Sequence, residues 1–172
     1  CALQHMNRVA YRDWKRARVV DALLRVGLDA GVVSETVEIE PASRRRATFA
    51  AERSGAQVAL SFHERASHRL QPFETCLILH PALMNGLDGV KRVSALLPSQ
   101  WRTFRATVTL CENGLDIDIA APSPRAPEGE ALTRLAAEMT RSGVVRLSID
   151  GEPFLTVTAP VVRFGEVAVA PP

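Results

Sequence analysis

Hydrophobic residues recur at helical spacing in three stretches of the chain. A period near 3.6 residues predicts helices over residues 6–27, 81–97 and 128–142. Gly27 and Gly143 are expected to end the first and the third helix, and Pro81 suits the first turn of the second. The pattern therefore predicts three amphipathic helices.

Between these helices, apolar and polar residues alternate as they do in strands with one buried face. The dipeptides Ser54-Gly55, Asn113-Gly114 and Asp150-Gly151 are turn signals. We expect three hairpins, which pair 45–53 with 56–63, 102–111 with 114–120, and 144–149 with 153–159. Single strands are expected at 36–40, 68–73 and 161–169. The expected fold is α+β, with antiparallel sheet built from hairpins and about three amphipathic helices packed on one side.

Composition places the chain among ordinary globular proteins. Its 172 residues suit one domain, and 47% are hydrophobic while 23% are charged. No apolar run approaches the roughly 20 residues needed to cross a bilayer, and no signal peptide is evident. Three cysteines form no disulfide framework, which favours a reducing compartment. A cytoplasmic monomer without a membrane partner is expected.

Positive charge is concentrated in one segment, although the net charge is only +2. Residues 41–72 contain six arginines and two acidic residues. Arginine binds phosphate through a bidentate fork and stacks on bases. Alternation along a strand would place Arg44 and Arg46, with Arg65, on one exposed face. A GC-rich genome also enriches arginine, so the clustering carries more weight than the abundance.

Two cysteines precede predicted helices and are candidate metal ligands. Cys1 comes before the first helix and Cys76 before the second. Structural zinc and iron–sulfur centres usually need four protein ligands, so either the pair is coincidental or further ligands lie upstream of residue 1. Cys111 lies in strand sequence just before a turn, where an incidental or structural thiol is expected.

Asp116 and Asp118 are two residues apart on a predicted strand, so they face the same side. Such a pair could bind a metal or act as acid and base, or form the solvated face of an amphipathic strand. A hydrolase using both would also need a partner base. No Gly-x-Gly-x-x-Gly follows a strand, so no nucleotide or S-adenosylmethionine site is predicted here.

Four landmarks in order resemble the bacterial RNA 5-methyluridine (uracil-C5) methyltransferases, in their iron–sulfur branch. Cys1-Ala2-Leu3-Gln4-His5 resembles the end of the Cys-Gly-Gly-Cys-x-x-Gln-His motif. Pro41 to Ala47 resembles the Pro-x-x-x-Arg-x-Arg segment, and Phe62 to His68 the Gly-Phe-x-x-x-x-Ser-His segment, with Ser61 in place of the glycine. Cys76, followed by Leu77-Ile78-Leu79-His80-Pro81-Ala82-Leu83, resembles the fourth cluster cysteine. The resemblance is good over residues 1 to about 90 and loose beyond.

This resemblance implies ligands and RNA contacts. Cys1 and Cys76 would be two of four ligands of a 4Fe-4S cluster, with His5 and His80 nearby. The implied RNA-binding residues are Arg44, Arg45, Arg46, Arg65 and His68. The cluster is expected in the intact protein and not in this chain.

The resemblance also implies a place in a longer protein. Residues 1–172 would be the central RNA-binding, cluster-bearing domain of an S-adenosylmethionine-dependent RNA (uracil-5-)-methyltransferase acting on rRNA or tRNA. An N-terminal barrel and a C-terminal S-adenosylmethionine-binding domain would flank it. Catalytic residues would lie outside the chain, which is not expected to be active alone.

The alternative is a non-enzymatic α+β nucleic-acid-binding or scaffold domain without a cluster. In that case Cys1 and Cys76 would be unrelated. The two hypotheses differ in one geometric expectation, because a shared cluster requires the two sulfurs to be neighbours.

Overall fold

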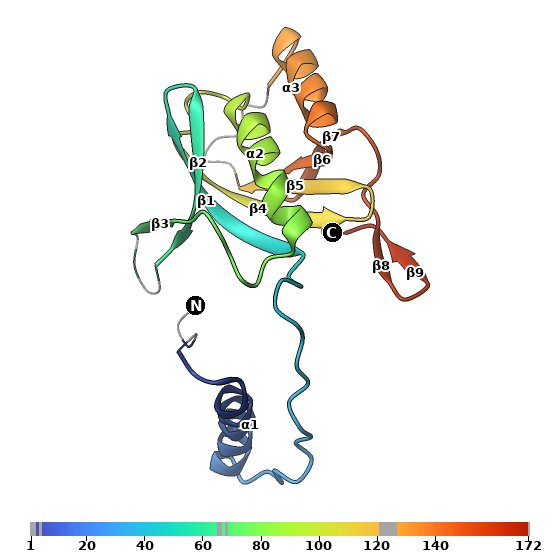
Figure 1. The fold of residues 1–172 in the computed structure, drawn as a ribbon. Helices are drawn as coiled ribbons and strands as arrows, with labels where there is room; N and C mark the ends of the chain where they lie inside the picture. Colours follow the sequence, from blue (N-terminus) through green and yellow to red (C-terminus); the bar gives the residue numbers. More distant parts are fainter. Residues whose placement is uncertain (1–2, 4, 65–66, 68, 121–126, 172) are drawn as a thin grey trace. The chain divides into compact units, whose positions relative to one another are not determined.

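A computed structural model describes residues 3, 5–64, 67, 69–120 and 127–171 of the chain (Figure 1). These residues form two compact units, Cys1–Glu40 and Pro41–Pro172, which are described one at a time. No helix in the described ranges has the length and apolar character needed to span a bilayer.

The first unit is one helix followed by a non-regular segment. Helix α1 (Arg8–Arg25) begins where the side chain of Asn7 accepts a hydrogen bond from the Ala10 amide, and Gly27 follows its end at φ +75°, as predicted. None of the residues of α1 is buried. The predicted strand at 36–40 is wrong: Val37 is 88% exposed. The alternation there has no partner strand and no apolar surface to cover.

The second unit is built on a seven-stranded sheet. Its strand order is β3-β2-β1-β4-β5-β6-β7. The strands are β1 (Arg46–Ser54), β2 (Gln57–His63), β3 (Leu70–Pro72), β4 (Thr103–Cys111), β5 (Gly114–Ala120), β6 (Val144–Ile149) and β7 (Glu152–Thr156). The three predicted hairpins are therefore confirmed as β1–β2, β4–β5 and β6–β7.

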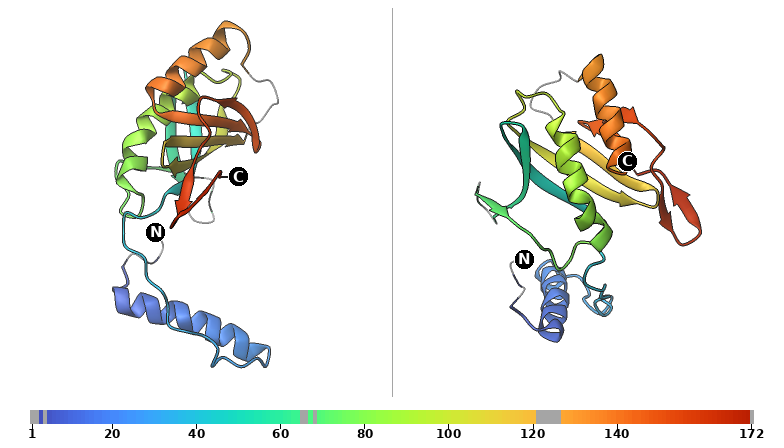
Figure 2. Two further views of the ribbon diagram at one scale, coloured as in Figure 1. Left: turned by 90° about the vertical axis from the view of Figure 1, so that its right-hand side faces the viewer. Right: turned by 45° about the horizontal axis from the view of Figure 1, so that its top comes forward.

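Two helices cover one face of this sheet. Helices α2 (Pro81–Ala95) and α3 (Glu130–Arg141) lie side by side on it (Figure 2, left). The sheet is antiparallel except for β5 and β6, which run parallel because α3 connects them. The α+β class is confirmed. Two of its three helices pack on the sheet, whereas α1 belongs to the other unit.

The strands divide their side chains between the two faces of the sheet. Odd-numbered β1 residues such as Phe49 and Ala51 face the helices and join a core that contains Leu83 and Val90 of α2 and Leu135 of α3. The opposite face, here called the open face, carries the even-numbered residues of β1 and their partners. Registry places on it Arg46, Thr48, Ala50 and Glu52 of β1, opposite Thr109, Thr107, Arg105 and Thr103 of β4.

The C-terminal segment forms a separate small hairpin. The single strand predicted at 161–169 is instead two strands, β8 (Val162–Phe164) and β9 (Val167–Val169). Gly165, at φ +62°, makes the turn between them. The prediction was wrong because this glycine was read as part of a strand.

Candidate nucleic-acid interface

The three consecutive arginines, Arg44 to Arg46, lie at the start of β1, the first strand of the sheet in the second unit. Just before β1, the Arg44 amide donates to the Ile78 carbonyl and the His80 amide donates to the Arg44 carbonyl, both at 2.9 Å. This short parallel pairing joins the arginine segment to the residues that precede α2. The backbone of the arginine segment is therefore held in place before the strand begins.

The side chains of these arginines differ in their surroundings. Arg44 and Arg46 are exposed, and Arg46 lies on the open face opposite Thr109. Arg45 is half-buried, and its Nη2 donates to Glu112 Oε1 at 2.7 Å. Among the described residues, two of the three guanidinium groups therefore face solvent without such a carboxylate partner, whereas Arg45 is paired with Glu112.

Arg65 and His68, the other predicted RNA contacts, lie outside the described residues. They belong to the connection between β2 and β3. Arg69 in this connection is exposed and lies 4.0 Å from Glu64. The roles of Arg65 and His68 stay predictions.

Arg53 belongs to the arginine-rich segment but does not reach the surface. It is 7% exposed on the helix-covered face, and its guanidinium donates to the carbonyls of Ser94, Ala95, Leu97 and Trp101. The first three lie at the end of α2, where carbonyls lack partners within the helix. Burial lowers the pKa of Arg53. The charge of this arginine therefore serves the fold and is not available to a ligand.

Cys76 is the described member of the predicted cluster pair. It is a half-buried free thiol that packs against the edge of the core, and the next residue, Leu77, accepts a hydrogen bond from the Ala42 amide. Cys1 lies outside the described residues, so the predicted proximity of the two sulfurs is untested. In the described ranges no three His, Cys, Asp or Glu side chains gather as a metal site would require. Cys76 alone provides too few ligands for a four-cysteine cluster.

His80 has a structural role that the sequence did not reveal. Its Nδ1 accepts a hydrogen bond of 3.1 Å from the Ala82 amide, so His80 is the N-cap of α2. Pro81 occupies the first turn, as predicted. The position of His80 directly before a proline that begins a helix is a sequence signal for this N-cap role, although histidine is not among the preferred N-cap residues.

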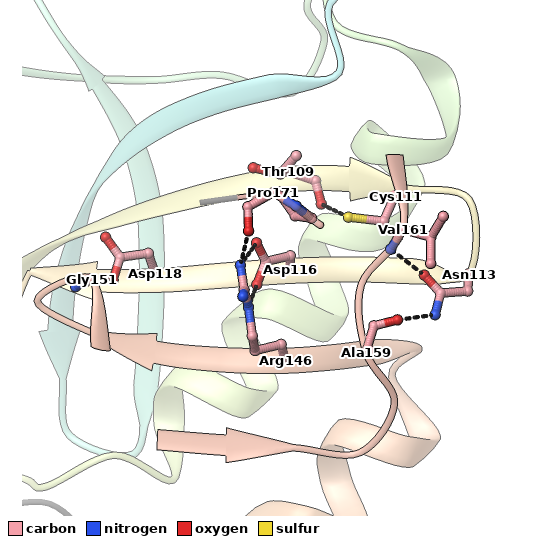
Figure 3. A network of polar contacts seen from close by, with 10 residues as sticks. All are labelled: Thr109, Cys111, Asn113, Asp116, Asp118, Arg146, Gly151, Ala159, Val161 and Pro171. Atoms are coloured by element: carbon pink, nitrogen blue, oxygen red, sulfur yellow. Dashed lines mark hydrogen bonds and ion pairs between the residues drawn. The ribbon is translucent and has the colours of Figure 1, made fainter. Parts of the chain in front are cut away.

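Asp116 and Asp118 share the open face, as predicted, but each holds the fold together. Arg146 on β6 donates from Nε and Nη2 to the two Asp116 oxygens at 2.8 and 2.9 Å (Figure 3). Asp118 accepts a hydrogen bond from the Gly151 amide in the β6–β7 turn. These contacts assign Asp116 and Asp118 to structural roles and give no support to a hydrolase.

The C-terminal segment is fastened to the same region. Arg146 Nη2 also donates to the Pro171 carbonyl at 2.9 Å. At the β4–β5 turn, the Asn113 side chain donates to the Ala159 carbonyl and accepts from the Val161 amide (Figure 3). Asn113 was predicted only as a turn residue, and its second role depends on a contact 46 residues away.

Cys111 is the last residue of β4, next to the β4–β5 turn, and its thiol is unreactive. The thiol is buried, and burial, aided by the nearby Asp116 charge, raises the pKa of Cys111 to about 11. At neutral pH it therefore stays protonated and is a poor nucleophile or ligand. The expected structural role of Cys111 agrees with its burial.

The open face also has a depression, which lies near the Ala120 end of β5 and not near its Asp116 end. A depression of about 890 Å³ is lined by Ala50, Ala51, Glu52, His63, Leu70, Thr103, Phe104, Arg105, Ala120 and Asp150. Its residues come from β1 to β5 and from the turn after β6. No local sequence pattern predicts this depression, because its lining comes from strands that are far apart in the chain.

Comparison with known proteins shows where sequences like this one occur. No protein-family model matches the chain. The whole chain is 37% identical to 40% of a protein of Mesorhizobium japonicum described as an uncharacterized RNA methyltransferase, and 36% identical to 41% of one from Brucella suis with the same description. Over 93 residues, 53% of this chain, it is 39% identical to 19% of a Halomonas elongata protein named 23S rRNA (uracil(1939)-C(5))-methyltransferase. The chain spans about 40% of the length of the first two relatives, and it is homologous along its whole length to a portion of such RNA methyltransferase-family proteins.

Proposed function

We propose that this chain is the RNA-contacting central portion of an S-adenosylmethionine-dependent enzyme that methylates carbon 5 of uracil in rRNA or tRNA. The observation that carries this proposal is the homology of the entire chain to proteins described as RNA methyltransferases. The Halomonas elongata match supports uracil C5 as the target. S-adenosylmethionine supplies the methyl group, and its site and the reacting residues are assigned to the remainder of the protein.

The role of this chain in such an enzyme is to grip RNA. Arg44 and Arg46 are exposed; the backbone of Arg44 is fixed by hydrogen bonds to residues 78 and 80, and Arg46 is paired with Thr109 of β4. A guanidinium group on a rigid support binds phosphate in a defined direction. Enzymes that modify a base take it out of the stack, so the neighbouring nucleotides must be held elsewhere. Arg44 and Arg46 would hold these nucleotides, together with the predicted contacts Arg45, Arg65 and His68.

Binding of labelled single-stranded RNA, measured by fluorescence anisotropy over a range of salt concentrations, tests this role. Each phosphate contact contributes a slope of about −0.7 in log affinity against log salt. The double variant Arg44→Gln/Arg46→Gln should therefore bind more weakly, with a slope shallower by about 1.4. Arg134→Gln, an exposed arginine on α3, is the matched control and should leave the slope unchanged. RNA affinity that is absent or independent of salt would contradict the proposal.

Methylation itself is tested on the full-length protein that contains this chain. Incubation with S-adenosylmethionine and unmodified 23S rRNA or tRNA, followed by nucleoside mass spectrometry, should yield 5-methyluridine. A product methylated at another base or position would refute the uracil C5 assignment while leaving RNA binding intact.

The cluster is proposed for the same full-length protein, with Cys1 and Cys76 as two of its ligands. Cys76→Ser should lower the iron content and the visible absorbance after anaerobic purification. Cys111→Ala is the matched control, because the Cys111 thiol is buried with a raised pKa, and it should keep the iron. Equal iron in both variants would remove Cys76 from the ligand set.

A further inference from the structure

The depression on the open face is lined by residues of β1 to β5 and of the turn after β6. Ala50 and Ala120 supply small side chains on β1 and β5, with Arg105 of β4 between them in registry. Glu52 lies two residues along β1 from Ala50, on the same face. His63 and Leu70 pair directly across β2 and β3 at the edge. The short side chains of Ala50 and Ala120 leave open space on both sides of Arg105, and this space is the hollow.

Three polar side chains in this hollow differ in chemistry and have no assigned partner. In the described part of the chain, Glu52, His63 and Arg105 form neither a side-chain hydrogen bond nor an ion pair, and Glu52 and Arg105 are exposed. Registry sets Arg105 opposite Ala50, so Glu52 is its diagonal neighbour on the same face. Two carboxylates (Glu52 and Asp150), an imidazole and a guanidinium therefore surround one space, and Glu52 and Arg105 form no ion pair with each other in the described structure.

The position of the hollow connects it to the arginine segment. Arg46 and Arg105 lie on the same face of the β1–β4 pair, opposite Thr109 and Ala50 respectively. Four residues of β4 separate these registry positions, a distance of roughly 13 Å along the strand. Between them lie Thr48 and Thr107, whose hydroxyls are hydrogen-bonded to each other at 2.9 Å. A flat polar track therefore runs from Arg46 to the hollow.

We propose that this hollow holds one unpaired nucleotide of single-stranded RNA, with Arg105 on its phosphate and Glu52 on the edge of its base. The inference rests on the proposed RNA-binding function and adds a base-reading subsite to it. Open sheet faces bind single-stranded RNA by stacking bases and contacting their Watson–Crick edges. His63 and Leu70 provide a ring and an apolar side chain for the base, and a volume of about 890 Å³ is ample for one nucleotide.

The carboxylate predicts which bases are preferred. An ionised Glu52 only accepts hydrogen bonds, so it favours a base with two adjacent N–H donors at its Watson–Crick edge, one for each carboxylate oxygen. Guanine has such a pair, N1–H and the N2 amino group, whereas uracil offers the single N3–H, and cytosine and adenine offer one exocyclic amino group each. The hollow should therefore prefer guanosine to the other three nucleosides.

The test compares three labelled octamers binding to the full chain: uridylate, cytidylate, and uridylate with one guanylate at a central position. The guanylate-containing octamer should bind about tenfold more tightly than the other two, the effect of one additional hydrogen bond to a charged group. Glu52→Gln should remove this preference, because an amide can both donate and accept. Arg105→Gln should weaken all three octamers by about tenfold. Arg134→Gln is again the charge-matched control, and urea unfolding verifies that each variant is folded.

The outcomes separate this subsite from the general RNA-binding role. If Glu52→Gln and Arg105→Gln bind every octamer like the unsubstituted chain while Arg44→Gln/Arg46→Gln binds weakly, the hollow is not a nucleotide subsite and the proposed function stands. If the unsubstituted chain binds no RNA, both proposals fail. Loss of the preference for the guanylate-containing octamer in Glu52→Gln alone, with the control unchanged, supports the subsite.

Discussion

Two arginine–carboxylate combinations lie on the open face of the same sheet, and they are in opposite states. Asp116 and Arg146, on neighbouring strands, form a bidentate ion pair with side chains only 7% and 12% exposed. Glu52 and Arg105, also on neighbouring strands, are both exposed and form no ion pair with each other in the described structure. Both combine an arginine with a carboxylate, so the kind of charge does not decide which charges serve the fold.

The difference comes from what covers each combination. The C-terminal segment passes the first one, where the Pro171 carbonyl takes a third hydrogen bond from Arg146. Removing charges from water costs free energy unless they are paired and fully hydrogen-bonded. Asp116 and Arg146 are therefore stable in this place only when both are present. At the hollow the corresponding groups remain hydrated and unpaired. They can exchange water for a ligand, and this contrast can be tested by removing one charge at a time.

The largest effect is expected at the covered pair. Arg146→Met leaves the Asp116 carboxylate buried without its counter-ion and should cost about 3–5 kcal/mol in the free energy of unfolding. Urea unfolding at neutral pH measures this loss. The double variant Asp116→Leu/Arg146→Met removes both charges and should recover most of it. A single variant as stable as the unsubstituted chain would mean that the pair is not effectively buried.

Arg53 tests whether an arginine can be structural without a carboxylate. Its guanidinium donates to four carbonyls at the end of α2 and in the following loop. Arg53→Met leaves these buried acceptors without a donor and should cost about 2–3 kcal/mol, measured by urea unfolding. Arg134→Met, on the exposed side of α3, should change stability by less than about 0.5 kcal/mol. Equal effects of the two variants would refute the capping role.

Glu138 is an intermediate case, a buried carboxylate with exposed cations. It accepts hydrogen bonds from Arg92 and Ser142 and pairs with Arg141, and the bond from Arg92 is the main reason that its pKa lies below the ordinary 4.5. A lowered folded-state pKa adds stability that is complete above pH 4.5 and is lost as pH falls through the folded value.

Glu138→Gln should therefore cost about 1 kcal/mol at pH 7 and markedly less at pH 3. Urea unfolding at both pH values measures the difference. The exposed Glu130→Gln on the same helix should show little change at either pH. A loss that is the same at pH 7 and pH 3 would show that the carboxylate charge is not involved.

The sequence could predict those features that depend on neighbours in the chain. The β4–β5 hairpin follows from Asn113-Gly114, and the start of α2 from Pro81. Strand parity also separates buried from exposed arginines in β1. Arg53 shares the odd positions of Ala47, Phe49 and Ala51, which are buried, whereas Arg46 does not. The six arginines of residues 41–72 therefore include both buried and exposed side chains.

Features that depend on distant contacts were out of reach of sequence patterns. The parallel pairing of β5 with β6 and the Pro171 contact with Arg146 need the folded chain. The strand predicted at 36–40 had the right alternation but no partner. The hollow likewise depends on strand order, because Glu52, His63 and Arg105 come from three different strands. Cys1, Arg65 and His68 lie outside the described residues, so their roles as ligand and RNA contacts remain predictions.

The smallest effect on stability is expected at the hollow, and it is the most informative of the four. Arg105→Gln and Glu52→Gln remove exposed charges that have no protein partner in the described structure, so each should change the free energy of unfolding by less than about 0.5 kcal/mol in urea. A loss above about 1 kcal/mol would mean that the two groups stabilise the fold as Asp116 and Arg146 do. Charges without such a role are the ones that a ligand can use, and near-neutral stability with altered RNA binding would distinguish this combination from the covered pair.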